Sequence, residues 1–153
     1  MIRRRLGISP VIAIVILIAV AVALGIAVAF WATGLIGTLG KVEKLEIRTA
    51  YASGDSTNGW TITMRGANTG TADITIVEIT VNGKPLSEWT GGAATIVGDS
   101  TATYNSGISA PISAGTSFTA TIYIKEGFTS GQTVEIALIS GSGTAFKRTV
   151  VLP

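Results

Sequence analysis

A long, uncharged and uniformly apolar run near the N-terminus constrains this chain more than any other feature. No charged residue occurs between Arg5 and Lys41, and residues 11–31 read VIAIVILIAVAVALGIAVAFW. The run is apolar on every side of a helix, so no hydrophobic stripe can be drawn. Strands rarely exceed about ten residues, whereas a helix of this length spans roughly 30 Å, enough to cross a bilayer. The sequence therefore predicts one long hydrophobic helix.

Ser9 and Pro10 mark the expected start of this helix. Ser9 can cap free backbone N–H groups, and proline fits the first helical position, where its missing N–H costs nothing. The basic cluster Arg3, Arg4 and Arg5 lies just before the run. Because clustered positive charge stays on the cytoplasmic side of a membrane, we expect everything after the helix to be translocated.

Two ordinary interpretations of such a helix must be weighed. A secretory signal peptide has an apolar core of about 7–15 residues followed by small residues at a cleavage site. This run is longer, and its basic cluster lies against a glycine, Gly7, before the apolar part. A plain single-span membrane anchor needs the same uniformly apolar helix as a filament subunit, so physical chemistry alone leaves those two open.

The N-terminus resembles the processing region of archaeal type IV pilin precursors. The resemblance is carried by RRRLG at positions 3–7, followed by ISPVIA at positions 8–13. In that family a membrane peptidase cuts after the glycine, ahead of the apolar helix. The resemblance implies a class III signal peptide over residues 1–7. The implied processing residues are Arg3, Arg4, Arg5, Gly7 and Ile8.

The resemblance also implies a role for residues 8–40, as an assembly or transmembrane helix followed by a hinge. The precursor would sit in the cytoplasmic membrane with its N-terminus inside, and a prepilin peptidase and pilus assembly machinery would be its partners. The mature subunit would then polymerise with itself into a cell-surface filament that serves adhesion. The implied filament-core residues are Pro10, Val11, Ile12, Ile14, Ile16, Leu17, Val20, Leu24 and Val28.

Related filament subunits differ from this sequence at the start of the helix. Bacterial type IV pilins carry a glutamate at the fifth mature position, which here is Ile12, so the bacterial interpretation is disfavoured. Archaeal flagellins share the architecture, but their helix usually opens with a pattern that contains Gly-Thr. An archaeal flagellin and a membrane-anchored β-sandwich binding protein remain the alternatives, with an anchored enzyme as a distant further one.

Residues 41–153 are expected to form a head made of strands. Threonine, valine and isoleucine are abundant, glycine punctuates the turns, and Asn82-Gly83 is a strong hairpin signal. This pattern predicts an antiparallel, immunoglobulin-like sandwich, so the whole chain has an α+β fold class. Residues 68–73, NTGTAD, resemble a turn-to-strand passage of many archaeal pilin heads. Strands are expected near residues 41–48, 60–65, 73–81, 94–97, 117–125, 133–139 and 145–152.

The composition argues against a catalytic, cofactor or metal site. The chain has no histidine and no cysteine, which removes the usual general base and the commonest metal ligands. Residues 55–59 lack the alternating acidic ligands of a calcium loop and are predicted to be a solvated turn. Residues 141–143 lack the third glycine of a dinucleotide fingerprint and are predicted to be a hairpin turn. We therefore expect no catalytic, cofactor-binding or metal-binding residues.

Charge and aromatic residues exclude other ligand classes. Removing Arg3, Arg4 and Arg5 from the 11 basic residues leaves 8 against 9 acidic ones, a net charge of −1, so nucleic acid is not an expected partner. The aromatic side chains of the head are expected to pack in its core rather than to form a ligand platform. These aromatic residues are Trp60, Trp89, Tyr51, Tyr104 and Tyr123.

Overall fold

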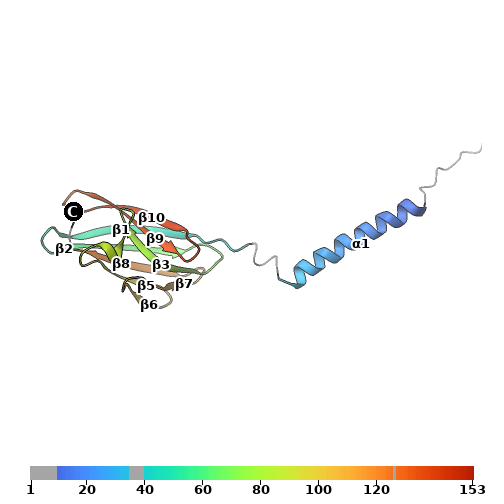
Figure 1. The fold of residues 1–153 in the computed structure, drawn as a ribbon, viewed down its shortest axis with the longest axis horizontal. Coiled ribbons are helices and arrows are strands. Elements are labelled where there is room, and N and C mark those ends of the chain that lie inside the picture. The colour runs from blue at the N-terminus through green and yellow to red at the C-terminus, as the bar shows by residue number, and fades with distance from the viewer. Residues whose placement is uncertain (1–9, 35–39, 126) are drawn as a thin grey trace, which may run out of the picture. The chain divides into compact units, whose positions relative to one another are not determined.

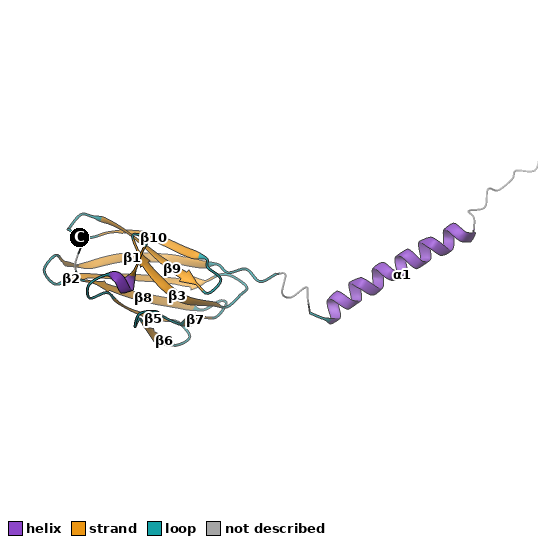
Figure 2. Cartoon of the chain, in the orientation of Figure 1, coloured by secondary structure: helices purple, strands orange, loops and turns teal. Residues whose placement is uncertain are grey.

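The computed structural model describes residues 10–34, 40–125 and 127–153. The chain divides into two units, Met1–Gly40 and Lys41–Pro153. Figure 2 shows one long helix in the first unit and a head of strands and loops with one short helical turn in the second. The predicted α+β class, a hydrophobic helix followed by a β-sandwich head, is confirmed.

The N-terminal unit contains a single helix, α1 (Pro10–Ala32). Proline occupies the first helical position, as predicted, while Ser9 lies outside the described residues. At the other end Thr33 Oγ1 donates a hydrogen bond to the carbonyl of Ala29 at 2.9 Å, and Gly34 follows with φ +67°. The helix therefore ends at the first glycine of the predicted hinge, and most of that hinge, residues 35–39, lies outside the described residues.

The head is a sandwich of two antiparallel sheets (Figure 1). The first sheet has the order β1-β2-β8-β5-β6, and the second has the order β10-β9-β3-β4, with β7 also paired to β3. The strands are β1 (Leu45–Asp55), β2 (Gly59–Asn68), β3 (Ile74–Val81), β4 (Lys84–Pro85), β5 (Ala93–Val97), β6 (Thr101–Thr103), β7 (Ala110–Ile112), β8 (Ser117–Ile124), β9 (Thr133–Ser140) and β10 (Ala145–Val151), with a 3-10 turn η1 (Leu86–Glu88) after β4.

The strand order is that of an immunoglobulin constant-type domain. In that fold strands A, B, E and D form one sheet, and strands C, F and G form the other. Here β1, β2, β8 and β5 take the places of A, B, E and D, while β3, β9 and β10 take those of C, F and G. The immunoglobulin-like prediction is therefore confirmed by topology.

The core lies between the two sheets and is built from alternate residues of each strand. Ile62 and Met64 of β2 and Ile122 of β8 are fully buried against residues of the opposite sheet such as Ile76 and Ile136. The intervening residues face outward, as period-2 geometry requires. None of the residues of α1 is buried, so the core of the head closes without the helix.

Turns fix the register where the sequence predicted them. Asn82 and Gly83 have φ values of +50° and +77°, the positive pair that a tight type I′ hairpin needs, and they join β3 to β4. The loop of residues 141–143 joins β9 to β10, with Gly143 N donating to Ser140 O at 2.9 Å. Both predicted hairpin turns are confirmed.

Several short elements were not predicted, and one strand is longer than expected. The strand β1 continues to Asp55, because a register shift between Ile47 and Thr49 interrupts its alternation. The strands β4, β6 and β7 and the turn η1 have only two or three residues each. Elements this short carry too few residues for an alternating pattern to be recognised.

Candidate functional site: the exposed apolar helix

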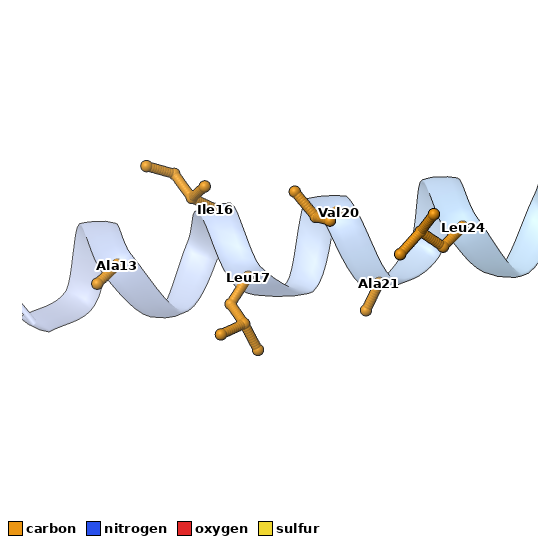
Figure 3. Close-up of a pocket in the computed structure, with 6 residues that line it drawn as sticks. All are labelled: Ala13, Ile16, Leu17, Val20, Ala21 and Leu24. Carbon is orange, nitrogen blue, oxygen red and sulfur yellow. The ribbon is translucent and has the colours of Figure 1, made fainter.

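The helix α1 presents apolar side chains to every side and contacts nothing within the described chain. Its 23 residues have a peak mean hydropathy of 3.3 and are entirely unburied. By length and composition it is long and apolar enough to cross a membrane. Figure 3 shows Ile16 and Val20 pointing to one side of the helix axis, and Leu17 and Ala21 pointing to the other. A surface of this kind requires an apolar environment on all sides.

Small and large residues alternate strictly over residues 19–30, which read AVAVALGIAVAF. Residues four positions apart lie on the same face of a helix, so an alternation of period two sorts the side chains into four lengthwise rows. Two rows are small and two are large, and the rows alternate around the axis. The small rows are Ala19, Ala23, Ala27 and Ala21, Gly25, Ala29, and the large rows are Val20, Leu24, Val28 and Val22, Ile26, Phe30.

This arrangement gives α1 two shallow grooves on nearly opposite sides, each flanked by ridges. Rows of residues four apart are the ridges that interdigitate when helices pack, and small residues let helix backbones approach closely in apolar surroundings. A Cβ added to Gly25 would meet nothing within 4 Å in the described chain. The groove at Gly25 is therefore open to another molecule.

The residues predicted for the filament core all lie on α1, and each of them is exposed: Pro10, Val11, Ile12, Ile14, Ile16, Leu17, Val20, Leu24 and Val28. They do not form one stripe but surround the helix. The predicted processing residues Arg3, Arg4, Arg5, Gly7 and Ile8 lie outside the described residues. The division of α1 into small and large rows was missed by sequence reasoning, although the alternation that encodes it is visible in residues 19–30.

The head begins with a neck, residues 41–44, which is held against one of its loops. Val42 N donates to Thr71 Oγ1 at 3.0 Å, and Thr71 N donates back to Val42 O at 2.9 Å. Lys44 O accepts the N–H groups of Thr69 and Gly70 at 2.8 and 3.2 Å. A Cβ on Gly70 would lie 2.2 Å from Val42 O, so only glycine permits this approach.

A second set of contacts ties the neck to the hairpin between β9 and β10. Glu43 Oε2 accepts hydrogen bonds from Ser140 Oγ at 2.8 Å and from Ser142 Oγ at 2.6 Å. Carboxylate acceptors make stronger hydrogen bonds than neutral ones. The neck is thus fixed on two sides before β1 begins, and the hydroxyls that bind Glu43 come from the serine-rich turn at residues 140–142.

Asn68 anchors the loop that receives the neck. Its side chain is buried, and its amide nitrogen donates to the carbonyls of Ala72 at 2.8 Å and Ile112 at 3.0 Å. Its side-chain oxygen accepts the N–H of Gly70 at 3.0 Å. A buried amide pays its desolvation cost only when it is paired in this way. The passage at residues 68–73, noted in the sequence as a turn before a strand, is therefore the receptor for the neck.

The turn between β1 and β2 is held by an aspartate. Asp55 Oδ1 accepts the N–H groups of Thr57 at 2.8 Å and Asn58 at 2.7 Å, and its other oxygen accepts the side-chain amide of Asn58. These hydrogen bonds, led by the backbone N–H of Asn58, hold the pKa of Asp55 below its usual range. The carboxylate is used to close the turn, which matches the turn predicted for residues 55–59.

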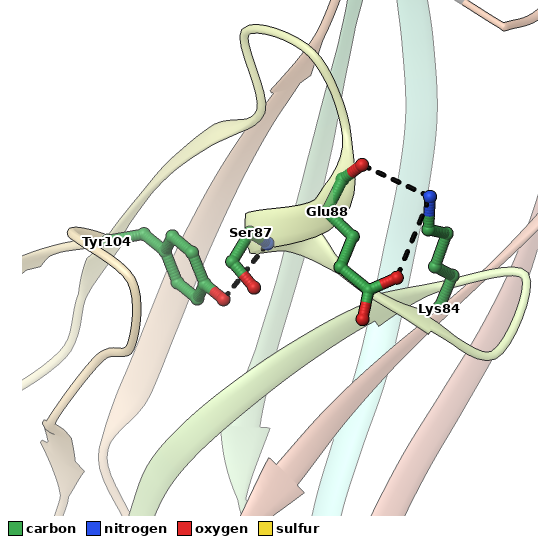
Figure 4. Close-up of polar contacts among 4 residues, drawn as sticks. All are labelled: Lys84, Ser87, Glu88 and Tyr104. Atoms are coloured by element: carbon green, nitrogen blue, oxygen red, sulfur yellow. Dashed lines mark hydrogen bonds and ion pairs between the residues drawn. The ribbon is translucent and has the colours of Figure 1, made fainter.

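The corner at η1 is held by polar contacts (Figure 4). Tyr104 donates its hydroxyl proton to Glu78 Oε1 at 2.7 Å and accepts the N–H of Ser87 at 3.2 Å. Burial, and then the hydrogen bond to Glu78, raise the pKa of Tyr104. Lys84 reaches the backbone carbonyl of Glu88 at 3.1 Å and its carboxylate at 3.6 Å. These contacts secure a loop and leave no reactive group free.

Most aromatic side chains of the head pack rather than form a ligand platform. Trp60 and Tyr104 are buried, and Trp89 stacks on Phe128 with ring centroids 4.8 Å apart. Tyr51 is the exception, because its side chain is about half exposed on β1. Within the described residues, no group of three or more histidine, cysteine, aspartate or glutamate side chains is placed to hold a metal ion.

Comparisons with known proteins find similar arrangements at low identity. No family model and no curated protein matches the chain. The archaellum periplasmic stator protein FlaG from Sulfolobus acidocaldarius aligns at 18% identity and a TM-score of 0.48, over 71% of this chain and 99% of its own. The Iho670 flagellar-like filament aligns at 14% identity and a TM-score of 0.45, over 94% of this chain and 98% of its own.

The complex of the stator proteins FlaF and FlaG from Sulfolobus acidocaldarius aligns at 17% identity and a TM-score of 0.41, over 71% of this chain and 89% of that chain. None of these alignments exceeds 18% identity. The fold assignment therefore rests on the strand order of the two sheets.

Proposed function

We propose that this chain is the structural subunit of an extracellular filament of the archaeal type IV pilus kind. A prepilin peptidase removes residues 1–7, assembly machinery lifts the subunit out of the cytoplasmic membrane, and α1 packs against copies of itself to form the filament core. The head remains on the outside, where it meets water and serves adhesion. The same architecture would suit an archaeal flagellin, which differs in that its filament rotates.

The observation that carries the proposal is the two-sided groove pattern of α1. A helix that pairs once needs one small-residue face, whereas α1 has small rows on nearly opposite sides, separated by large rows. A subunit with two opposed contact faces can bind one neighbour on each side, and repetition of such a contact gives an open-ended assembly. The head supports the proposal as well, because its core closes without the helix.

The energetics favour assembly once the helix leaves the lipid. Within a bilayer the surrounding chains are as apolar as the helix, so association depends on close packing alone. Outside the bilayer, burial is worth about 25 cal/mol per Å2 of apolar surface. The hydrogen bonds of the backbone are satisfied within α1 itself, so the helix tolerates either environment. Extraction from the membrane still needs work, which the assembly machinery supplies.

The processing step is tested by mass spectrometry of filament subunits. Filaments sheared from cells that express the chain should contain a subunit that begins at Ile8, and electron microscopy should show the filaments themselves. A mature protein that begins at Met1 or after residue 30 contradicts the class III signal peptide. A single-span anchor would leave the chain in the membrane fraction, with no filament in the sheared material.

The packing of α1 is tested by filling one of its grooves. Gly25→Leu adds bulk where the described chain leaves open space, and it raises both apolarity and helix propensity. The variant should insert into the membrane normally and fail to form filaments. Val28→Leu enlarges a ridge rather than a groove and should assemble as the parent does. Normal filaments from Gly25→Leu would contradict close helix packing at this row.

A further inference from the structure

The outer face of the β1-β2-β8-β5-β6 sheet is covered with hydroxyl groups and carries little charge. The strand register aligns two rows across the sheet. Within these five strands, all of which the structure describes, the charged residues are Glu46, Arg48, Asp55 and Arg65. The two rows are Tyr51, Thr63, Thr121, Thr95, Thr103 and Thr49, Arg65, Thr119, Val97, Thr101.

The register shift in β1 brings two arginines together on this face. Ile47 pairs with Gly66 and Thr49 pairs with Arg65, so Arg48 is the extra residue of a β-bulge. A bulge places two residues of one strand opposite a single residue of its partner. Arg48 is thereby added beside Thr49, on the strand next to Arg65.

These side chains line one open depression of about 370 Å3. Arg48 and Arg65 provide two guanidinium groups, while Thr49, Ser117 and Thr119 provide three hydroxyls. The head contains other arginine and lysine side chains, but this depression is lined by two of them together. It combines fixed positive charge with groups that both donate and accept hydrogen bonds.

Neither guanidinium has an ion-pair partner within the described part of the chain. Both ion pairs that form among the described residues use lysines, Lys84 with Glu88 and Lys147 with Glu135. The nearest acid on β1, Glu46, lies two residues before Arg48, and its side chain does not line the depression. Two exposed arginines thus keep their full donor capacity, in a head whose overall charge is −1.

We propose that this depression binds an anionic polysaccharide. Arginine presents a planar fork that matches a carboxylate or sulfate with two parallel hydrogen bonds, and Arg48 and Arg65 hold the acidic group of one sugar unit. The hydroxyls of Thr49, Ser117 and Thr119 bind neighbouring sugar hydroxyls. The exposed ring of Tyr51, two residues along β1 from Thr49 on the same face, supports the apolar face of the next sugar.

A polysaccharide fits this surface better than other anions do. The depression is open and continues into rows of threonine hydroxyls, which suits a long ligand made mostly of hydroxyl groups. A nucleic acid needs a run of basic contacts along its backbone, whereas the other strands of this sheet offer no further basic residue. The proposal gives the adhesion role under Proposed function a ligand class, although the binding itself does not require α1.

The test uses the full chain in detergent micelles and three polymers. Polygalacturonate carries carboxylates, dextran sulfate carries sulfates, and plain dextran carries neither. Biolayer interferometry should show binding to at least one charged polymer and none to dextran, and the two charged polymers identify which acidic group is preferred. The double variant Arg48→Gln/Arg65→Gln should bind about tenfold more weakly or worse, as expected when charged hydrogen bonds are lost.

A matched variant separates the site from general charge attraction. Lys125→Gln/Arg148→Gln removes the same two charges from exposed positions outside the depression and should change the affinity less than about twofold, because distant exposed charges are screened by salt. Glu46→Gln removes the neighbouring acid and should tighten binding. Equal loss in both double variants, binding to neither charged polysaccharide, or tighter binding to polyglutamate than to either would overturn the proposal.

Folding and filament formation are read separately from binding. Circular dichroism should give the same strand signal for every variant, and Arg48→Lys/Arg65→Lys, which keeps the charge without the planar fork, should bind more weakly than the parent. If filaments form on cells and the purified chain binds no charged polysaccharide, the site fails and the filament proposal stands. If binding is found and filaments are absent, the reverse holds.

Discussion

The two units of this chain use the same kind of side chain in opposite ways. Val20 of α1 and Ile122 of β8 are both β-branched aliphatic residues, yet Val20 is 52% exposed and Ile122 is fully buried. The head covers its aliphatic residues with its own second sheet, whereas α1 has no partner in the described chain. The comparison shows that the head can complete its fold alone, while α1 depends on lipid or on other subunits.

Their backbones differ in the same direction. The hydrogen bonds of a helix close within four residues, so α1 can form in lipid or in protein without long-range pairing. The strands of the head pair over long distances, as β2 does with β8, and each pairing depends on the rest of the sandwich. Damage to α1 should therefore affect assembly and leave the head folded, while damage to the head should lower its stability and leave α1 apolar.

The largest expected effect comes from a charge in the middle of α1. Val20→Asp places a carboxylate in a large row of the helix, where neighbouring subunits supply no evident partner. Burying it costs on the order of several kcal/mol in each subunit, and the cost repeats along the filament. Electron microscopy should show no filaments, while immunoblotting should still detect the precursor.

Val20→Ile is the control for this substitution, because it keeps a large aliphatic residue in the same row and should assemble. The head of the Val20→Asp chain should retain its circular dichroism and its thermal midpoint. Normal filament yield from Val20→Asp would show that this position is not part of an assembly core.

The second effect concerns the core of the head. Ile122→Ala removes a fully buried side chain and should lower the free energy of unfolding by about 2–5 kcal/mol. Thr121→Ala, one residue away on the outer face, should change it by less than about 0.5 kcal/mol. Urea denaturation of the head, residues 41–153, measures both. Equal losses at the two positions would contradict the inward and outward alternation of β8.

The sequence was sufficient for features that depend on neighbouring residues. The apolar run predicted the helix that begins at Pro10, and Asn82-Gly83 predicted the turn between β3 and β4. Alternation over residues 117–125 and 133–139 predicted β8 and β9. In each case the signal lies within one segment and needs no knowledge of what the segment packs against.

Features that depend on distant residues could not be predicted. Asn68 bonds to Ile112, 44 residues away, and Glu43 bonds to Ser142, 99 residues away, so no local pattern marks either contact. Arg48 and Arg65 meet only because of the bulge in β1. The processing residues, by contrast, rest on the resemblance to pilin precursors alone, since residues 1–9 lie outside the described part of the chain.

The third effect tests the loop that receives the neck. Asn68→Ala removes two donated hydrogen bonds and one accepted hydrogen bond at a buried position, which leaves two carbonyls and an N–H without their partner. We expect a loss of about 2–3 kcal/mol in the free energy of unfolding. Asn58→Ala, in an exposed turn, is the control and should lose less. An unchanged midpoint for Asn68→Ala would show that water replaces the amide.

The fourth effect is smaller and depends on pH. Tyr104→Phe removes the hydrogen bonds to Glu78 and Ser87 and should cost about 1 kcal/mol at neutral pH. Because burial and Glu78 raise the pKa of Tyr104 in the folded head, its contribution is complete below the unfolded value of about 10. The contribution is lost as the pH rises through the folded value. Stability should therefore fall less steeply above pH 10 in Tyr104→Phe than in the parent.

The smallest expected effect separates the two units by pH. The pKa of Asp55 is lowered by hydrogen bonds from Asn58 and Thr57, so its contribution to the head is present above the unfolded value of about 3.9 and is lost as the pH falls through the folded value. Asp55→Asn should lower the midpoint slightly at pH 7, and the difference from the parent should vanish in acid. Glu46→Gln, on the same strand, controls for the lost charge. The helix α1 has no ionisable side chain, so acid that weakens this turn should leave the proposed filament core assembled. Filaments that come apart over the same pH range in the parent but not in Asp55→Asn would show that the head, and not α1 alone, holds the polymer together.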